Sequence, residues 1–196
     1  AKIRYNKEIS DFSLMDHYSD EKLLDLFHNS DNLNYAFNLL VKKYQERVYW
    51  HVRRLVTDHE DTNDIVQEVF VKAWKGLENF RADSGLFTWL YRIATNEALS
   101  FLKRKKRRFF LPWQDVENTM AQKLEMDAYF TGNEIQKKLQ KAILTLPEKQ
   151  RVVFNMRYYD ELRYEEMSDI LGTSKGALKA SYHHAVKKVE EYVINH

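Results

Sequence analysis

Residues 164–184 read YEEMSDILGTSKGALKASYHH, a stretch with the pattern of a helix–turn–helix. That motif needs a short first helix, a tight turn, and a second helix whose N-terminal side chains can reach the major groove of DNA. Residues 165–171 fit the first helix. Gly172 stands where this helix would end, and Ser174 stands where the next would be capped. The stretch therefore predicts a helix–turn–helix whose second helix begins at Lys175.

The start of the predicted second helix carries candidate DNA contacts. Small side chains there would allow a close approach to DNA, and a lysine can donate to a phosphate or a guanine. The candidates on the exposed side of this helix are Lys175, Gly176, Lys179, Ala180 and His183. An ordinary helical hairpin that never touches DNA is the alternative interpretation of the same pattern.

The sequence on both sides of the motif is also helical in pattern. Residues 134–146 predict a helix that Pro147 would stop, and residues 148–159 predict the next. After the turn, one apolar stripe with helical spacing is formed by Leu178, Tyr182, Ala185, Val189 and Val193. We therefore expect residues 134–196 to form one small helical domain.

An earlier set of helices is predicted over residues 22–108. The acidic residues that follow Ser19 suit the positive end of a helix dipole. Apolar positions recur at helical spacing through residues 33–56 and again through residues 64–77. A further helix is expected from about Thr88 into the basic run that follows it. On that helix we expect burial of Leu90, Ile93, Ala94, Ala98 and Phe101, and other orientations for Tyr91, Arg92, Thr95 and Asn96.

Two segments lack this regularity. Residues 1–21 are mixed and polar, and we interpret them as an N-terminal extension. Residues 109–133 contain Pro112 and Gly132 and lose clean periodicity, which indicates a linker with room for one short helix. The predicted fold class is therefore all-α, with two small helical domains joined by a linker and a helix–turn–helix in the second.

Composition excludes several classes of protein. The 196 residues include only five glycines and two prolines, too few for a turn-rich all-β protein. The absence of cysteine excludes disulfides, thiolate zinc sites and cysteine nucleophiles, and it suits a reducing compartment. The N-terminal residues lack the apolar segment of a signal peptide, and no stretch approaches the length of a membrane span. We expect a cytoplasmic protein without membrane insertion.

Charge is separated along the chain, although the formal net charge is only +2. Residues 58–68, DHEDTNDIVQE, are acidic, whereas residues 103–108, KRKKRR, are all basic. Such a separation suits two partners of opposite character. The acidic group lacks the glycine of an EF-hand loop, and no HExxH pair occurs. A docking face for a protein is the better interpretation, and we expect no metal, no cofactor and no enzymatic activity.

The basic run follows a cluster of aromatic residues. Phe80, Phe87, Trp89 and Tyr91 surround a loop and the start of the helix that carries the run. Single-stranded nucleic acid is held by such rings within a basic groove, and each stacked base contributes roughly 1–3 kcal/mol. The alternative is that the rings fill the core and that the run is a solvated helix end. We expect some of these rings to contact nucleic acid and others to fill the core.

Two long stretches carry a resemblance to a known family. Residues 64–108 begin DIVQEVFVKAWKGLENF, continue RADSGLFTWLYRIATNEALS and end FLKRKKRR. This stretch resembles the second conserved region of extracytoplasmic-function (ECF, group IV) sigma factors. Residues 146–191, LPEKQRVVFNMRYYDELRYEEMSDILGTSKGALKASYHHAVKKVEE, resemble their fourth conserved region. The resemblance covers about residues 22–108 and 134–193.

The resemblance implies a dissociable subunit that gives bacterial RNA polymerase its promoter specificity. The first domain would bind the clamp helices of the β′ subunit and capture a base flipped from the melted −10 element. The second would dock near the β flap and read the −35 element, while the linker threads toward the RNA exit channel. An anti-sigma factor is a further possible partner.

Site residues follow from the resemblance by position. The polymerase-binding residues would be Asp64, Gln67 and Glu68. The −10 DNA-binding residues would be Lys72, Phe80, Asp83, Ser84, Trp89, Arg92, Asn96 and Lys103. The −35 DNA-binding residues would be Ser174, Lys175, Gly176, Lys179, Ser181 and His183. Asn96 offers both a donor and an acceptor, which suits a flipped base whose extrusion costs a few kcal/mol.

The second domain departs from the family pattern. Ser181, His184 and Val186 stand where the family commonly has arginine, while Lys179 remains. Fewer charged contacts are therefore expected, with readout that leans on backbone placement and DNA shape. Two rival hypotheses remain at this stage: a stand-alone helix–turn–helix regulator, and a metal-dependent enzyme that processes nucleic acid.

Overall fold

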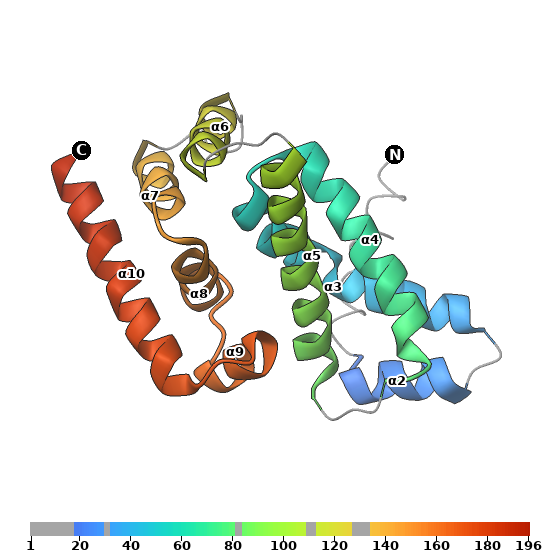
Figure 1. Cartoon of the computed structure of the whole chain (residues 1–196). Helices are drawn as coiled ribbons and strands as arrows, with labels where there is room; N and C mark the ends of the chain where they lie inside the picture. The colour runs from blue at the N-terminus through green and yellow to red at the C-terminus, as the bar shows by residue number, and fades with distance from the viewer. Residues whose placement is uncertain (1–17, 30–31, 81–83, 109–112, 127–133) are drawn as a thin grey trace, which may run out of the picture.

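The computed structural model describes residues 18–29, 32–80, 84–108, 113–126 and 134–196. These residues form helices and connecting turns, with no strand among them (Figure 1). The helices are α2 (Asp20–Asn29), α3 (Leu33–Val56), α4 (His59–Leu77), α5 (Leu86–Arg108), α6 (Trp113–Met126), α7 (Glu134–Leu144), α8 (Glu148–Tyr158), α9 (Tyr164–Leu171) and α10 (Lys175–Asn195). The all-α prediction is confirmed. None of the described helices has both the length and the apolar character required to cross a bilayer.

The N-terminal unit consists of α2–α5, in which α4 and α5 pack against α3. Side chains that precede α2 and α4 cap these helices. The Ser19 hydroxyl accepts a hydrogen bond from the N–H of Lys22 at 3.2 Å, and Asp58 accepts one from the N–H of Asp61 at 2.8 Å. These caps satisfy N–H groups that have no partner within the helix. The buried residues shared by these helices include Leu55, Ile65, Val69, Ala73, Leu90 and Ala94.

The C-terminal unit consists of α7–α10 and contains the predicted helix–turn–helix as α9 and α10. Gly172 ends α9 in the left-handed conformation, with φ 61°, and its N–H donates to the carbonyl of Ser168 at 2.9 Å. Ser174 caps α10 by accepting from the N–H of Ala177 at 3.3 Å. Both positions agree with the sequence, because a glycine tolerates positive φ and a serine hydroxyl satisfies a free N–H.

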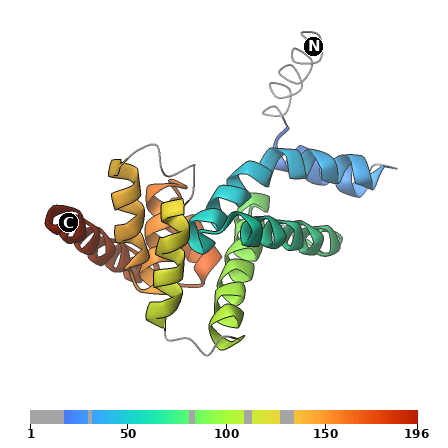
Figure 2. The ribbon, with the colours of Figure 1, turned by 90° about the horizontal axis from the view of Figure 1, so that it is seen from above.

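The segment interpreted as a linker contains α6, while Pro112 and Gly132 lie outside the described residues. Met120 and Leu124 of α6 are buried against Leu102 at the end of α5 and Leu144 of α7. Figure 2 shows α6, drawn in yellow, between α5 and the C-terminal helices. Helix α6 therefore packs against both units.

The two units also share one core, which the sequence did not predict. Apolar residues of α8 and α9, including Val152, Met156 and Ile170, belong to the same buried cluster as those of α3 and α5. Tyr91 and Thr95 were expected away from the core but are both 1 % exposed. They are buried because α5 is covered on a second face: the His51 ring of α3 packs on Tyr91 with its centroid 4.7 Å away.

Candidate nucleic-acid interface

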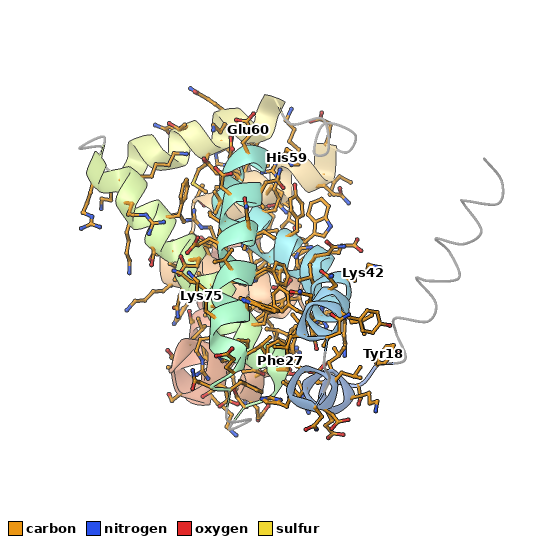
Figure 3. The ribbon with its side chains drawn as sticks, turned by 90° about the vertical axis from the view of Figure 1, so that its right-hand side faces the viewer. Tyr18, Phe27, Lys42, His59, Glu60 and Lys75 are labelled. Atoms are coloured by element: carbon orange, nitrogen blue, oxygen red, sulfur yellow. The ribbon has the colours of Figure 1, made fainter. Side chains whose placement is uncertain are left out.

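The three predicted polymerase-binding residues, Asp64, Gln67 and Glu68, are all exposed on α4. Residues at spacings of three and four lie side by side on a helix, so the three side chains form one polar strip. Beside the strip, an open groove of about 490 Å³ lies between α3 and α4. The groove is lined by Asn34, Phe37, Asn38, Gln67, Phe70, Val71 and Trp74. Figure 3 looks onto α4, with Glu60 at one end and Lys75 near the other.

The acidic residues at the start of α4 do not act as one cluster. Asp61 pairs with Lys105 at 2.7 Å, and Asp58 pairs with Lys123 of α6. Burial alone would raise the pKa of Asp58, but the hydrogen bonds from Lys123 and the Asp61 N–H outweigh it, and the pKa is lowered. In the part of the chain that the structure describes, no three side chains are grouped to hold a metal ion. Within the strip, the Glu68 carboxylate lies 3.8 Å from the ammonium of Lys72, one turn further along α4.

Two aromatic residues predicted for the −10 site lie together. The rings of Phe80 and Trp89 have centroids 5.0 Å apart and are inclined by 51°. Both side chains are half-buried, so each ring contacts the core and keeps an accessible part. The Trp89 ring lies over Gly76 of α4, where a Cβ would be only 2.9 Å from Cζ2. Ser84 is described and half-buried, whereas Asp83 lies outside the described residues.

The polar residues predicted for the −10 site have different environments. Asn96 and Lys103 are exposed on α5. Lys72 of α4 pairs with Glu97 of α5 at 2.6 Å, a partner that the sequence did not indicate. Arg92 points toward the C-terminal unit and donates to the Asp169 carbonyl at 2.7 Å. The structure thus brings Phe80 and Trp89 together but engages Arg92 elsewhere.

The residues predicted to contact the −35 element lie along the start of α10. Lys175, Gly176, Lys179 and His183 are exposed, and Ser181 is half-buried. The remaining member, Ser174, is exposed, and its hydroxyl is the helix cap described above. Gly176, Lys179 and His183 face away from the buried Leu178, Ala185 and Val189, whereas Lys175 and Ser181 lie at the edges of that buried face.

Three of these side chains have neighbours within the motif. Lys175 pairs with Glu165 of α9 at 3.2 Å, and the ammonium of Lys179 lies 5.6 Å from the centroid of the Tyr164 ring. His183 has its ring centroid 6.0 Å from that of His184. Lys187 is also exposed and continues the row from Lys179 through His183. The four-residue spacing of Lys179, His183 and Lys187 is visible in the sequence, and it is the signal that could have added Lys187 to the predicted DNA-binding residues.

Comparison with known proteins gives two family matches, which cover successive parts of the chain. Residues 40–108 match the Sigma-70 region 2 family, and residues 136–189 match the Sigma-70, region 4 family. The first match contains the polar strip on α4, Phe80 after the end of that helix, and Trp89 on α5. The second contains the helix–turn–helix.

Relatives match over nearly their whole length. The chain is 33% identical over 185 residues to the ECF RNA polymerase sigma-E factor of Escherichia coli strain K12, which covers 89% of this chain and 94% of that protein. It is 31% identical over 182 residues to the RNA polymerase sigma-H factor of Pseudomonas aeruginosa, which covers 88% and 92%.

Two solved structures share the fold. One is the sigma factor RpoE in complex with the anti-sigma factor NepR from Bartonella quintana, with a TM-score of 0.63 and 21% identity over 80% of this chain and 96% of that one. The other is CnrH in complex with the cytosolic domain of CnrY, with a TM-score of 0.65 and 22% identity over 90% and 97%. The two family matches, in this order along the chain, and the relatives that match over nearly their whole length show that the chain belongs to the ECF family of RNA polymerase sigma factors.

Proposed function

We propose that the chain is a group IV sigma factor that acts in the cytoplasm and, without catalytic activity of its own, directs core RNA polymerase to −10 and −35 promoter elements. The observation that carries the proposal is the separation of two exposed faces. One is the strip of Asp64, Gln67 and Glu68 on α4, and the other is the row of Lys179, His183 and Lys187 on α10. A protein that joins an enzyme to DNA needs two such surfaces of different charge.

The α4 strip would bind the clamp helices of the β′ subunit. Its two carboxylates favour a basic partner, and the adjoining groove, which Gln67 and Val71 line, accepts an apolar side chain. The C-terminal unit would dock near the β flap. Such an interface combines charge complementarity around its edge with an apolar centre, as stable protein interfaces commonly do.

The aromatic pair and Asn96 would hold the opened −10 strand. Extruding a base from a duplex costs a few kcal/mol, and stacking on a ring contributes roughly 1–3 kcal/mol per base. The half-buried Trp89 supports this role because the core fixes its orientation while part of the ring stays accessible. Asn96 is exposed on the same helix and offers a donor and an acceptor for a base edge.

The start of α10 would enter the major groove at the −35 element. Lys175, Lys179 and Lys187 provide phosphate or guanine contacts, but the helix has no arginine. Recognition by this unit is therefore expected to depend on DNA shape and backbone contacts as well as on base edges. Since one solved structure that shares the fold is the sigma factor RpoE in complex with the anti-sigma factor NepR, we also propose that an anti-sigma factor binds this chain.

The decisive experiment is run-off transcription with bacterial core polymerase, with and without the protein, on a library of upstream regions from its own genome. Initiation that depends on the protein and shares a −10/−35 pattern is the expected result. Tight binding to duplex DNA without core polymerase, and no binding to core, would instead support the stand-alone regulator.

A further inference from the structure

Glu97 is the only acidic residue in the sequence of α5, which otherwise carries Arg92 and the basic run that ends the helix. Its carboxylate lies 2.6 Å from the ammonium of Lys72 on α4. The Glu97 side chain is 14 % exposed and that of Lys72 is 44 % exposed. The pair therefore consists of a largely covered carboxylate and an ammonium that water or a phosphate can still reach.

This ion pair borders the face that we assign to the opened −10 strand. Asn96 directly precedes Glu97 and follows Trp89 by seven residues, which is about two turns of α5. On α4, Lys72 lies one turn before Gly76, over which the Trp89 ring packs. The two helices lie side by side (Figure 1). The pair thus connects two helices that both carry predicted DNA contacts.

Glu97 is the main partner of Lys72, although a second carboxylate lies nearby. The Glu68 carboxylate is 3.8 Å from the same ammonium, and its side chain is 54 % exposed. An exposed pair on one helix is weak, because water and salt screen it. The carboxylate of Glu97 is closer to the ammonium and better covered, so it has the larger effect on the charge of Lys72.

A lysine without such a partner would attract any DNA strand at this place. Phosphates are the same in all sequences, so contacts to them raise affinity without conferring specificity. A carboxylate beside the lysine cancels this attraction and leaves the contacts to base edges intact. The opened strand is then held mainly by base contacts, which only the correct sequence provides.

A gain in affinity that is equal for all sequences would still reduce discrimination between promoters. A promoter that is already fully open cannot open further, whereas a promoter with a mismatched −10 element can. A residue that lowers the attraction for all strands therefore limits opening to promoters with the best base contacts.

We propose that Glu97 is a specificity-determining residue, whose carboxylate cancels the charge of Lys72 beside the opened −10 strand. The inference rests on the proposed function, because it concerns the strand that Asn96 and Trp89 would hold. The ion pair itself is measurable in the free protein. In a double-mutant cycle of urea unfolding, the effects of Lys72→Ala and Glu97→Gln should not add.

The test measures promoter opening by the complex of this protein with core polymerase, from permanganate reactivity at several salt concentrations. The DNA is a promoter found by run-off transcription, and the same promoter with one base of its −10 element changed. Glu97→Gln should raise the opening constant of both about three- to tenfold at about 0.1 M salt. The slope of log K against log salt should steepen by about 0.7, since one lysine becomes free to pair with a strand phosphate.

Two controls determine whether the effect passes through Lys72. In the Lys72→Ala background, Glu97→Gln should leave the slope unchanged and the opening constant within about twofold, because no lysine is freed. Glu46→Gln makes the same substitution at an exposed residue of α3 outside the predicted sites, and it should not alter opening. Glu97→Ala should repeat the effect of Glu97→Gln, and it replaces that variant should circular dichroism show that Glu97→Gln does not fold.

Weaker or unchanged opening in folded Glu97→Gln and Glu97→Ala would overturn the proposal, as would an equal gain in the Lys72→Ala background. A gain confined to one base of the −10 element would also overturn it, and would make Glu97 a direct base contact. Additive effects in the unfolding cycle would disprove the ion pair without bearing on the proposed function. If wild-type protein with core polymerase opens no promoter, the proposed function fails instead.

Discussion

The ring of Trp89 fills the space beside Gly76, so that a Cβ at position 76 would lie 2.9 Å from Trp89 Cζ2. This glycine lies within α4, where alanine would otherwise favour the helix by up to about 1 kcal/mol. The contact therefore explains why glycine is suited to this position: it lets α4 approach the aromatic pair that we assign to the −10 site.

Gly76→Ala should push the Trp89 ring away from its position. We expect a net destabilisation of about 1–3 kcal/mol from overpacking, measured by urea unfolding, together with weaker promoter opening. The control for stability is Gly176→Ala in α10, where a Cβ meets nothing within 4 Å. That change should be neutral or stabilising. Equal stability effects in the two variants would contradict the packing argument.

Asp58→Ala should destabilise the protein by about 1–2 kcal/mol, because it removes the cap of α4 and the ion pair with Lys123. Asp58→Asn should keep most of the cap and lose only the charge. Since the folded-state pKa of Asp58 is lowered, its charge contributes stability above the unfolded-state pKa near 4, and this is lost as pH falls through the lowered value.

The free energies of unfolding of wild type and Asp58→Asn should therefore converge as the pH falls below the unfolded-state pKa near 4. Urea titrations of the two proteins at pH 7 and at pH 3 measure this difference. If the difference in free energy of unfolding between the two proteins instead grows as the pH falls, the charge of Asp58 is not stabilising.

Asn96→Ala should impair promoter opening by about tenfold or more, since each well-placed pair of hydrogen bonds to a base contributes about 1–3 kcal/mol. The residue is exposed, so stability should change by no more than about 0.5 kcal/mol. Permanganate reactivity of the −10 strand measures the opening. Co-purification with core polymerase is the control and should be retained, and full opening by the variant would refute the assignment.

Reversing Asp64 and Glu68 together to lysine should weaken binding to core polymerase. Both side chains are exposed, so the loss arises from charge repulsion at the interface and should diminish in high salt. Glu190→Lys with Glu191→Lys changes the net charge equally at two exposed positions of α10. This control should bind core polymerase within about twofold of wild type in a fluorescence titration. Equal losses of binding in the two double variants would attribute the effect to net charge alone.

Lys179→Ala should reduce the salt dependence of promoter binding by the polymerase complex. If Lys179 contacts a phosphate, the slope of log K against log salt should fall in magnitude by about 1, with little change in sequence preference. A loss confined to one base at the −35 element would instead assign Lys179 to direct readout.

The sequence by itself determined the local structure of this protein. Gly172 and Ser174 fixed the turn of the helix–turn–helix, because a helix ends or begins through conformations and hydrogen bonds within a few residues of the chain. Apolar periodicity likewise located α3–α5 and α7–α10, since it reports which face of a helix is buried. The exposed strip at 64–68 followed from the same pattern.

Only the tertiary structure decided which faces meet. Asp160 belongs to no periodic pattern, yet it pairs with His51, 109 residues away in the chain. Arg92 matches a DNA-binding position by sequence but contacts Asp169, and Tyr91 and Thr95 are buried on a face of α5 that looked polar. Apolar periodicity identifies the most apolar face of a helix, but it does not indicate whether another segment covers a second face. The partner of a buried polar group depends on contacts between segments that are far apart in sequence.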